Sequence, residues 1–95
     1  MDSETFVKKA LPKIKKLIVK TLYNKHKLTQ TEIANKLYIS QASVSYYIND
    51  LRAIGSFEMN EKIVKSIEIF ADRITNEKIS KKDLEEFYEE IRNSI

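Results

Sequence analysis

Glycine and proline each occur only once in this 95-residue chain, which leaves few positions where a hairpin or tight turn could form. Isoleucine and leucine recur at steps of three and four residues, and no segment alternates apolar and polar residues over the length of a strand. Hydrophobic residues make up 42% of the chain, which is enough for a modest core. We therefore expect a single all-α domain over residues 1–95.

The first apolar stripe extends from Ser3 to about Lys25 and has the spacing of one helix face. Pro12 has no amide proton for an interior hydrogen bond, so we expect it in the first turn of the main helix. Residues 3–9 would then form a separate short turn of helix or a kinked extension. His26, in the polar connector that follows, is interpreted as a surface residue, because the chain has no cysteine or second histidine to complete a metal site.

Thr29 to Glu32 has the pattern of a capping box. In such a box the threonine hydroxyl accepts the Glu32 amide proton, and the Glu32 carboxylate accepts the Thr29 amide proton. This pattern predicts a helix from Gln30 to about Leu37.

A second helix start follows within a few residues. Ser40 is a suitable N-cap for a helix from Gln41 to about Arg52, and Gly55 is a suitable C-terminal stop. Two short capped helices joined by three or four residues have the geometry of a helix-turn-helix, in which one helix enters the major groove of DNA and the other braces it. Residues 11–55 are the expected core of this motif.

Two further amphipathic helices are expected in residues 59–95, forming a C-terminal hairpin. The first is capped near Asn60, and its apolar residues keep a 4-3-4 spacing at Ile63, Ile67, Phe70 and Ile74. Ser80 to Asp83 is a weaker capping signal for the second. We expect residues 59–95 either to mediate homodimerisation through the Ile63/Ile67/Phe70/Ile74 seam or only to cap the core.

The segment Gln30-Thr-Glu-Ile-Ala-Asn-Lys-Leu-Tyr-Ile-Ser-Gln-Ala-Ser-Val-Ser-Tyr-Tyr-Ile-Asn resembles the phage-repressor-type (Xre/Cro) helix-turn-helix. Together with Leu11-Pro12-x-Ile14, it is similar to a group of small archaeal predicted regulators. This resemblance implies a five-helix, all-α domain with a lambda-repressor-like core. It also implies a cytoplasmic, sequence-specific regulator of transcription that binds double-stranded DNA with helix 41–52 in the major groove.

In such proteins the first residue of each of the two helices can be a glutamine, and the two glutamines can pair. One then binds a phosphate and the other reads an adenine. Gln30 and Gln41 occupy these two positions. The residues expected to contact bases are Gln41, Ala42, Ser43, Ser45 and Asn49. The residues expected to contact the DNA backbone are Gln30, Thr31, Lys36, Tyr46 and Arg52. Tyr46 could equally be a partly buried core aromatic. The sequence departs from the pattern at Tyr38, where a glycine is common, so Tyr38 is either strained or part of a different turn.

Charge is distributed unevenly along the chain. Residues 1–28 carry a net charge of +6, residues 29–55 are neutral, and residues 56–95 carry −3. The basic first segment either faces a polyanion or is simply a solvated helix face. If it supplies part of the phosphate attraction, DNA binding should weaken steeply with salt.

The remaining features favour a non-enzymatic protein without cofactor or metal. One glycine cannot form a glycine-rich phosphate loop, and no apolar run has the length of a membrane span. The spacing of Glu85, Glu86, Glu89 and Glu90 places them on an exposed helix face rather than in a catalytic cluster. The alternative function is a helix-turn-helix module that binds a protein partner, such as the transcription machinery or a toxin, or an effector-sensing fragment of a larger regulator.

Overall fold

The computed structural model describes residues 2–50 and 61–95. All regular structure in these residues is helical, which confirms the all-α prediction. The helices are α1 (Ser3–Thr5), α2 (Leu11–Asn24), α3 (Gln30–Leu37), α4 (Gln41–Asn49), α5 (Glu61–Asn76) and α6 (Lys81–Ser94), with a π-helical segment at Phe6–Ala10. The predicted stop at Gly55 and the predicted cap at Asn60 lie outside the described residues.

The N-terminal segment is continuous with α2, as expected for an extension of the main helix and not for a separate turn. Pro12 lies in the first turn of α2, where its missing amide proton costs little. The Leu11 amide donates to the Phe6 carbonyl, an i to i+5 bond that marks the π-helical turn just before the proline. Phe6 and Ala10 are buried, so this segment contributes to the core.

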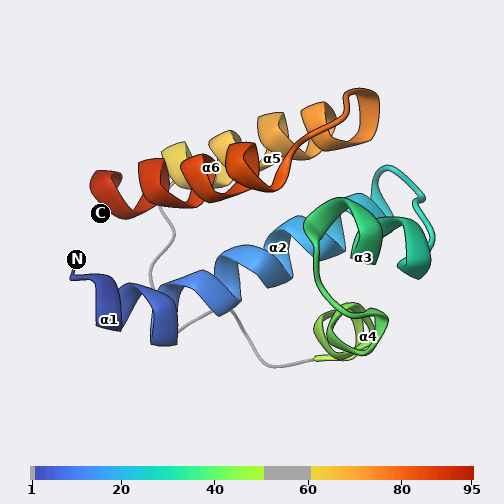
Figure 1. Cartoon of the computed structure of the whole chain (residues 1–95), viewed down its shortest axis with the longest axis horizontal. Coiled ribbons are helices and arrows are strands. Elements are labelled where there is room, and N and C mark those ends of the chain that lie inside the picture. The colour runs from blue at the N-terminus through green and yellow to red at the C-terminus, as the bar shows by residue number, and fades with distance from the viewer. Residues whose placement is uncertain (1, 51–60) are drawn as a thin grey trace.

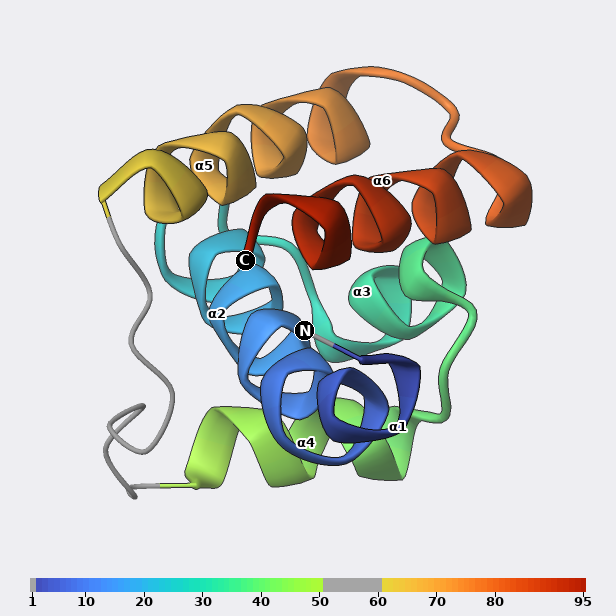
Figure 2. The ribbon, with the colours of Figure 1, turned by 90° about the vertical axis from the view of Figure 1, so that its left-hand side faces the viewer.

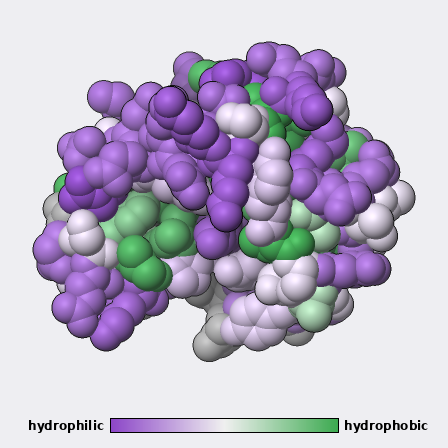
Figure 3. All heavy atoms as spheres, in the orientation of Figure 1, coloured by the Kyte–Doolittle hydropathy of each residue, from purple (hydrophilic) through white to green (hydrophobic). Residues whose placement is uncertain are grey.

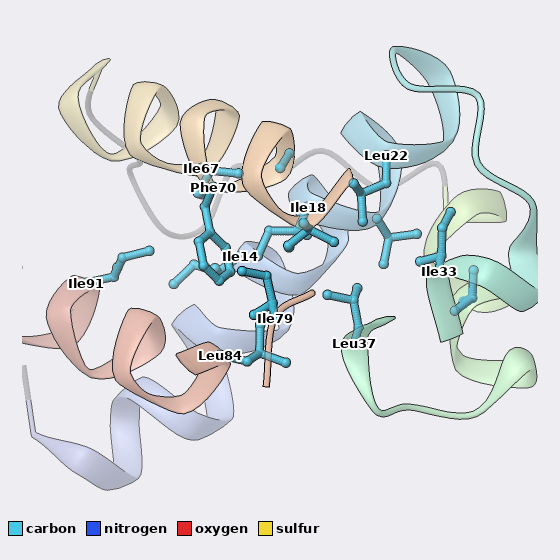
Figure 4. Close-up of a cluster of buried hydrophobic side chains, with 14 of the residues drawn as sticks. Ile14, Ile18, Leu22, Ile33, Leu37, Ile67, Phe70, Ile79, Leu84 and Ile91 are labelled. Atoms are coloured by element: carbon cyan, nitrogen blue, oxygen red, sulfur yellow. The ribbon is translucent and has the colours of Figure 1, made fainter. Parts of the chain in front are cut away.

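Helix α2 is the centre of the molecule. In Figures 1 and 2, α4 lies below it and the antiparallel pair α5 and α6 lies above it. Three α2 side chains, Ile14, Ile18 and Leu22, are fully buried and face residues of α3, α5 and α6 in the core shown in Figure 4. The hairpin and α4 therefore occupy opposite sides of one shared helix.

The apolar seam of α5 lies inside the protomer. Ile63, Ile67, Phe70 and Ile74 are each at most 3% exposed, and Phe70 stacks on Phe87 of α6 with ring centroids 3.9 Å apart. The seam that motivated the dimer hypothesis therefore packs within this chain. On the face shown in Figure 3 the surface is largely hydrophilic, with an apolar area between the N-terminal segment and α6.

His26 is not the surface residue expected from the sequence. Its side chain is 13% exposed, and its Nε2 atom lies 2.9 Å from Asp72 Oδ1 of α5, although no aligned hydrogen bond joins the two. The connector after α2 is thus packed against α5. A contact across 46 positions of sequence leaves no local signal by which it could have been predicted.

Candidate nucleic-acid interface

The first helix of the motif, α3, begins and ends where the sequence predicts. Thr29 Oγ1 accepts the Glu32 amide proton at 3.1 Å, and Glu32 Oε1 accepts the Thr29 amide proton at 3.1 Å, which completes the capping box. These bonds to Thr29 hold the pKa of the Glu32 carboxyl below its ordinary value. The helix buries Ile33, Ala34 and Leu37, so its opposite face and its first turn remain at the surface.

The turn between α3 and α4 uses a left-handed residue, Tyr38, with φ 58° and ψ 39°. The side chain resists this conformation, which glycine adopts freely. Two contacts hold it: the Tyr38 amide donates to the Ala34 carbonyl, and the Tyr38 hydroxyl donates to the Ile79 carbonyl at 3.0 Å. The turn thus keeps the left-handed geometry expected of a glycine, and a residue from the α5–α6 connection supports it.

Helix α4 is capped as predicted but ends earlier. Ser40 Oγ accepts the Ser43 amide proton at 3.0 Å. The helix ends at Asn49, not near Arg52, because Asp50 leaves the helical conformation with ψ 110°. Arg52 itself lies outside the described residues.

The outward face of α4 is polar and includes most of the predicted base-contacting residues. Gln41, Ala42 and Asn49 are exposed, and Ser45 is half-buried. Asn49 Nδ2 donates to the Ser45 carbonyl at 2.9 Å, so these two side chains lie together one turn apart. Ser43 is different: its Oγ accepts a hydrogen bond from Ser40 Oγ at 2.9 Å, which directs it toward the cap.

Tyr46 is the most exposed aromatic side chain among the described residues, at 55%. It contacts Tyr47 edge to face, with ring centroids 5.7 Å apart. Tyr47 is half-buried, and this burial, with a smaller effect of Tyr46, raises the pKa of its hydroxyl. The structure therefore places Tyr46 on the surface, where it can contact a ligand, and gives the packing role to Tyr47.

The predicted backbone-contacting residues do not form one group. Thr31 is exposed and Gln30 half-buried at the start of α3, but no hydrogen bond joins Gln30 to Gln41 in the described residues. The Lys36 ammonium donates to the Ile74 carbonyl at 3.1 Å and so caps the C-terminal end of α5. The Lys36 ammonium is therefore bound to the hairpin in the protein without DNA.

A shallow, open hollow lies beside the start of α3, and one of its lining residues is Lys27, a cationic side chain that was not predicted to contact DNA. It is lined by Tyr23, Asn24, Lys27, Leu28, Thr29 and Gln30. Lys27 is exposed and has a left-handed backbone, with φ 60°. Its position two residues before the capping box is the sequence signal that could have pointed to it.

Part of the basic first segment is occupied by contacts within the protein. Lys16 is 5% exposed and pairs with Asp50, while the Lys20 ammonium donates to the Asp50 carbonyl at 3.2 Å. Lys15 lies over the Tyr88 ring, 5.7 Å from its centroid. Lys9 remains exposed. Only some of the eight lysines are therefore available to a polyanion.

Residues 11–55 match a family model described as winged helix-turn-helix DNA-binding, which covers slightly less than half of the chain. No curated protein and no solved structure matches the sequence. The match covers α2, α3 and α4, the three helices whose packing forms the motif. Residues 11–55 are therefore similar to a helix-turn-helix DNA-binding domain, and the hairpin of α5 and α6 lies C-terminal to them.

Proposed function

We propose that this protein is a sequence-specific transcriptional regulator that places α4 in the major groove of double-stranded DNA. The observation that carries the proposal is the outward face of α4, a row of short polar side chains on a capped helix that follows a capped bracing helix. Within this face, Gln41 is the principal base-reading residue, since a glutamine can bond an adenine edge through two atoms. Ala42, Ser45 and Asn49 complete the reading face, and the hydrogen bond of Ser43 to the cap gives that residue a minor part.

Phosphate contacts are proposed at the start of α3 and along the N-terminal segment. Lys27, Gln30 and Thr31 lie at the helix start, where the free amides and the helix dipole favour an anion. Tyr46 is exposed enough to reach a phosphate or a sugar. No lysine or arginine occurs in α4 itself, so the charge must come from these flanking positions.

The finer classification as a phage-repressor-type, cytoplasmic regulator belongs to this proposal. In residues 2–50 and 61–95 there is no strand, and the elements that follow α4 are the helices α5 and α6. The resemblance of residues 30–49 to the phage-repressor-type motif supports this classification. None of the described helices has the length and hydropathy that crossing a membrane requires.

Homodimerisation is proposed on functional grounds alone, because one nine-residue helix reads few base pairs for tight specific binding. The α5 seam gives it no support, since that seam is buried in the protomer. Sedimentation of the free protein and of its DNA complex tests it. Two protomers on a two-fold symmetric site with half-sites about 10 base pairs apart would support the dimer, and one protomer on an asymmetric site would refute it.

The central experiment is selection of bound sequences from a random duplex pool, followed by titration of the selected site and of random duplex at several salt concentrations. Gln41→Ala should reduce the preference for the selected site about 10-fold or more while changing affinity for random duplex little. Lys27→Gln should weaken the affinity for the selected site and for random duplex equally, and should lower the slope of log affinity against log salt by about one. Lys81→Gln, an exposed lysine on α6, is the matched control and should change neither.

The runner-up function is a protein-binding module. The observation that favours it is the neutral face of α4 with the exposed Tyr46, since tyrosine is enriched in protein interfaces and lysine is depleted. An affinity for random duplex that is absent even at low salt would favour this function over the first.

A further inference from the structure

Lys16 is the one charged side chain that is buried among the residues described by the structure. A buried ammonium group is stable only when an anion or other acceptors replace its water. Lys16 Nζ lies 3.5 Å from Asp50 Oδ2, and the Asp50 side chain is itself only 12% exposed. A buried pair of this kind joins α2 to the residue that directly follows α4.

Lys20, one turn further along α2, binds the same residue by its main chain. Its ammonium donates to the Asp50 carbonyl at 3.2 Å, while the Asp50 amide donates to the Tyr46 carbonyl at 2.9 Å. Asp50 is thus held by its carboxylate, its carbonyl and its amide. Two cations also lie at the C-terminal end of α4, where the helix dipole favours positive charge.

The apolar anchoring of α4 is otherwise small. Of its nine residues only Val44 is buried, and Tyr47 and Ile48 are half-buried. Val44 fixes the middle of the helix, and Tyr47 and Ile48 pack against the edge of the core. At the C-terminal end of the helix, the contacts of Asp50 add a polar attachment to α2.

We infer that Lys16, with Lys20, is a positioning residue for DNA recognition: the pair holds the C-terminal end of α4 against α2 and so sets where Ser45 and Asn49 meet the bases. This inference rests on the proposed function. A hydrogen bond to a base is lost when its atoms separate by more than about 3.5 Å, so a shift of about 1 Å at the helix end is sufficient to remove one.

The test compares wild type with the double variant Lys16→Met/Asp50→Leu, which replaces the pair by apolar side chains of similar volume that need no partner. We expect a folded protein whose affinity for random duplex stays within about twofold of wild type. Its preference for the selected sequence should fall about tenfold. Lys15→Met, which removes one α2 charge that faces Tyr88, is the matched control and should retain the preference.

Amide hydrogen exchange of the DNA-free protein provides a readout that does not depend on binding. In the double variant the last amides of α4 should exchange about tenfold faster, while those of α3 stay unchanged. If the double variant does not fold, Lys20→Met is measured in its place and should show the same changes at smaller size. A variant with wild-type preference and wild-type exchange would overturn the inference. A wild type without salt-dependent duplex affinity would instead refute the proposed function, and exchange alone would then decide whether the pair holds the helix end.

Discussion

Helices α4 and α5 lie on opposite sides of α2 and are held by different means. Helix α5 buries five of its sixteen residues, whereas α4 buries one of nine. Besides its few core contacts, α4 has a serine cap at its start and the Lys16–Asp50 pair at its end. A helix that must expose one face to a ligand has little apolar surface to bury, so polar contacts at its two ends replace part of the core.

The largest expected effect tests whether the hairpin is part of the core. Phe70 is 3% exposed and stacked on Phe87, so Phe70→Ala should lower the free energy of unfolding by about 3–5 kcal/mol, measured by urea denaturation. The neighbouring Ile69 is 55% exposed, and Ile69→Ala should change the free energy of unfolding by less than about 0.5 kcal/mol. Equal effects of the two substitutions would mean that the hairpin does not contribute to the core as described.

Substitutions in the N-caps of α4 and α6 distinguish an effect on stability from an effect on DNA binding. Ser40 and Ser80 each accept the amide proton of the residue three positions on, at 3.0 Å. Replacing either with alanine should therefore destabilise the protein by about 1 kcal/mol. Only Ser40→Ala should also weaken binding to the selected DNA, because the proposed reading face lies on α4 alone. A similar loss of binding from Ser80→Ala would break the division between the two regions.

Tyr38 tests the contact between the two regions. Tyr38→Phe removes the hydroxyl that bonds the Ile79 carbonyl and should cost about 0.5–1.5 kcal/mol, measured by thermal unfolding. Tyr38→Gly loses the same bond but relieves the left-handed backbone, a gain of about 1 kcal/mol, so its net effect should be smaller. A glycine variant much less stable than the phenylalanine variant would show that the tyrosine ring contributes more than its hydroxyl.

The smallest effect concerns pH. Hydrogen bonds from Thr29 and Ser80 lower the pKa of Glu32 and Asp83 below their ordinary values. A carboxyl with a lowered folded-state pKa adds stability above its unfolded pKa of about 4, and this stability is lost as the pH falls through the folded pKa. Glu32→Gln and Asp83→Asn should each flatten the acid limb of the stability curve. An acid limb identical to that of wild type would exclude the carboxylate from the cap.

The sequence predicted the helix starts well because caps are local. Thr29, Ser40 and Ser80 each act on a residue three positions away, and all three caps are present in the structure. For residues 3–9 the sequence left open a separate turn of helix or a kinked extension, and the structure shows helical segments that are continuous with α2. The end of α4 was not predicted, because Lys16 and Lys20, which bind Asp50 there, lie 34 and 30 positions earlier in the chain.

In the candidate site, too, the features set by local sequence were predicted and those set by distant contacts were not. The polar outward face of α4 follows from helical periodicity and the positions of Val44 and Tyr47. The contact of Lys36 with the hairpin was not predicted, because its acceptor, the Ile74 carbonyl, lies 38 positions away. Lys27 was missed because a single exposed lysine has no periodicity, and only the hollow beside Gln30 distinguishes it.

By itself, the sequence determined which segments are helices, where most of them begin, and which face of each is apolar. Only the tertiary structure decided which partner each face meets. It placed the α5 seam inside the protomer, bonded Tyr38 and Lys36 to the hairpin, and used Lys16 to hold the end of α4. The physical reason is range: caps and periodicity act over three or four residues, whereas the partner of a buried face depends on how distant helices pack together.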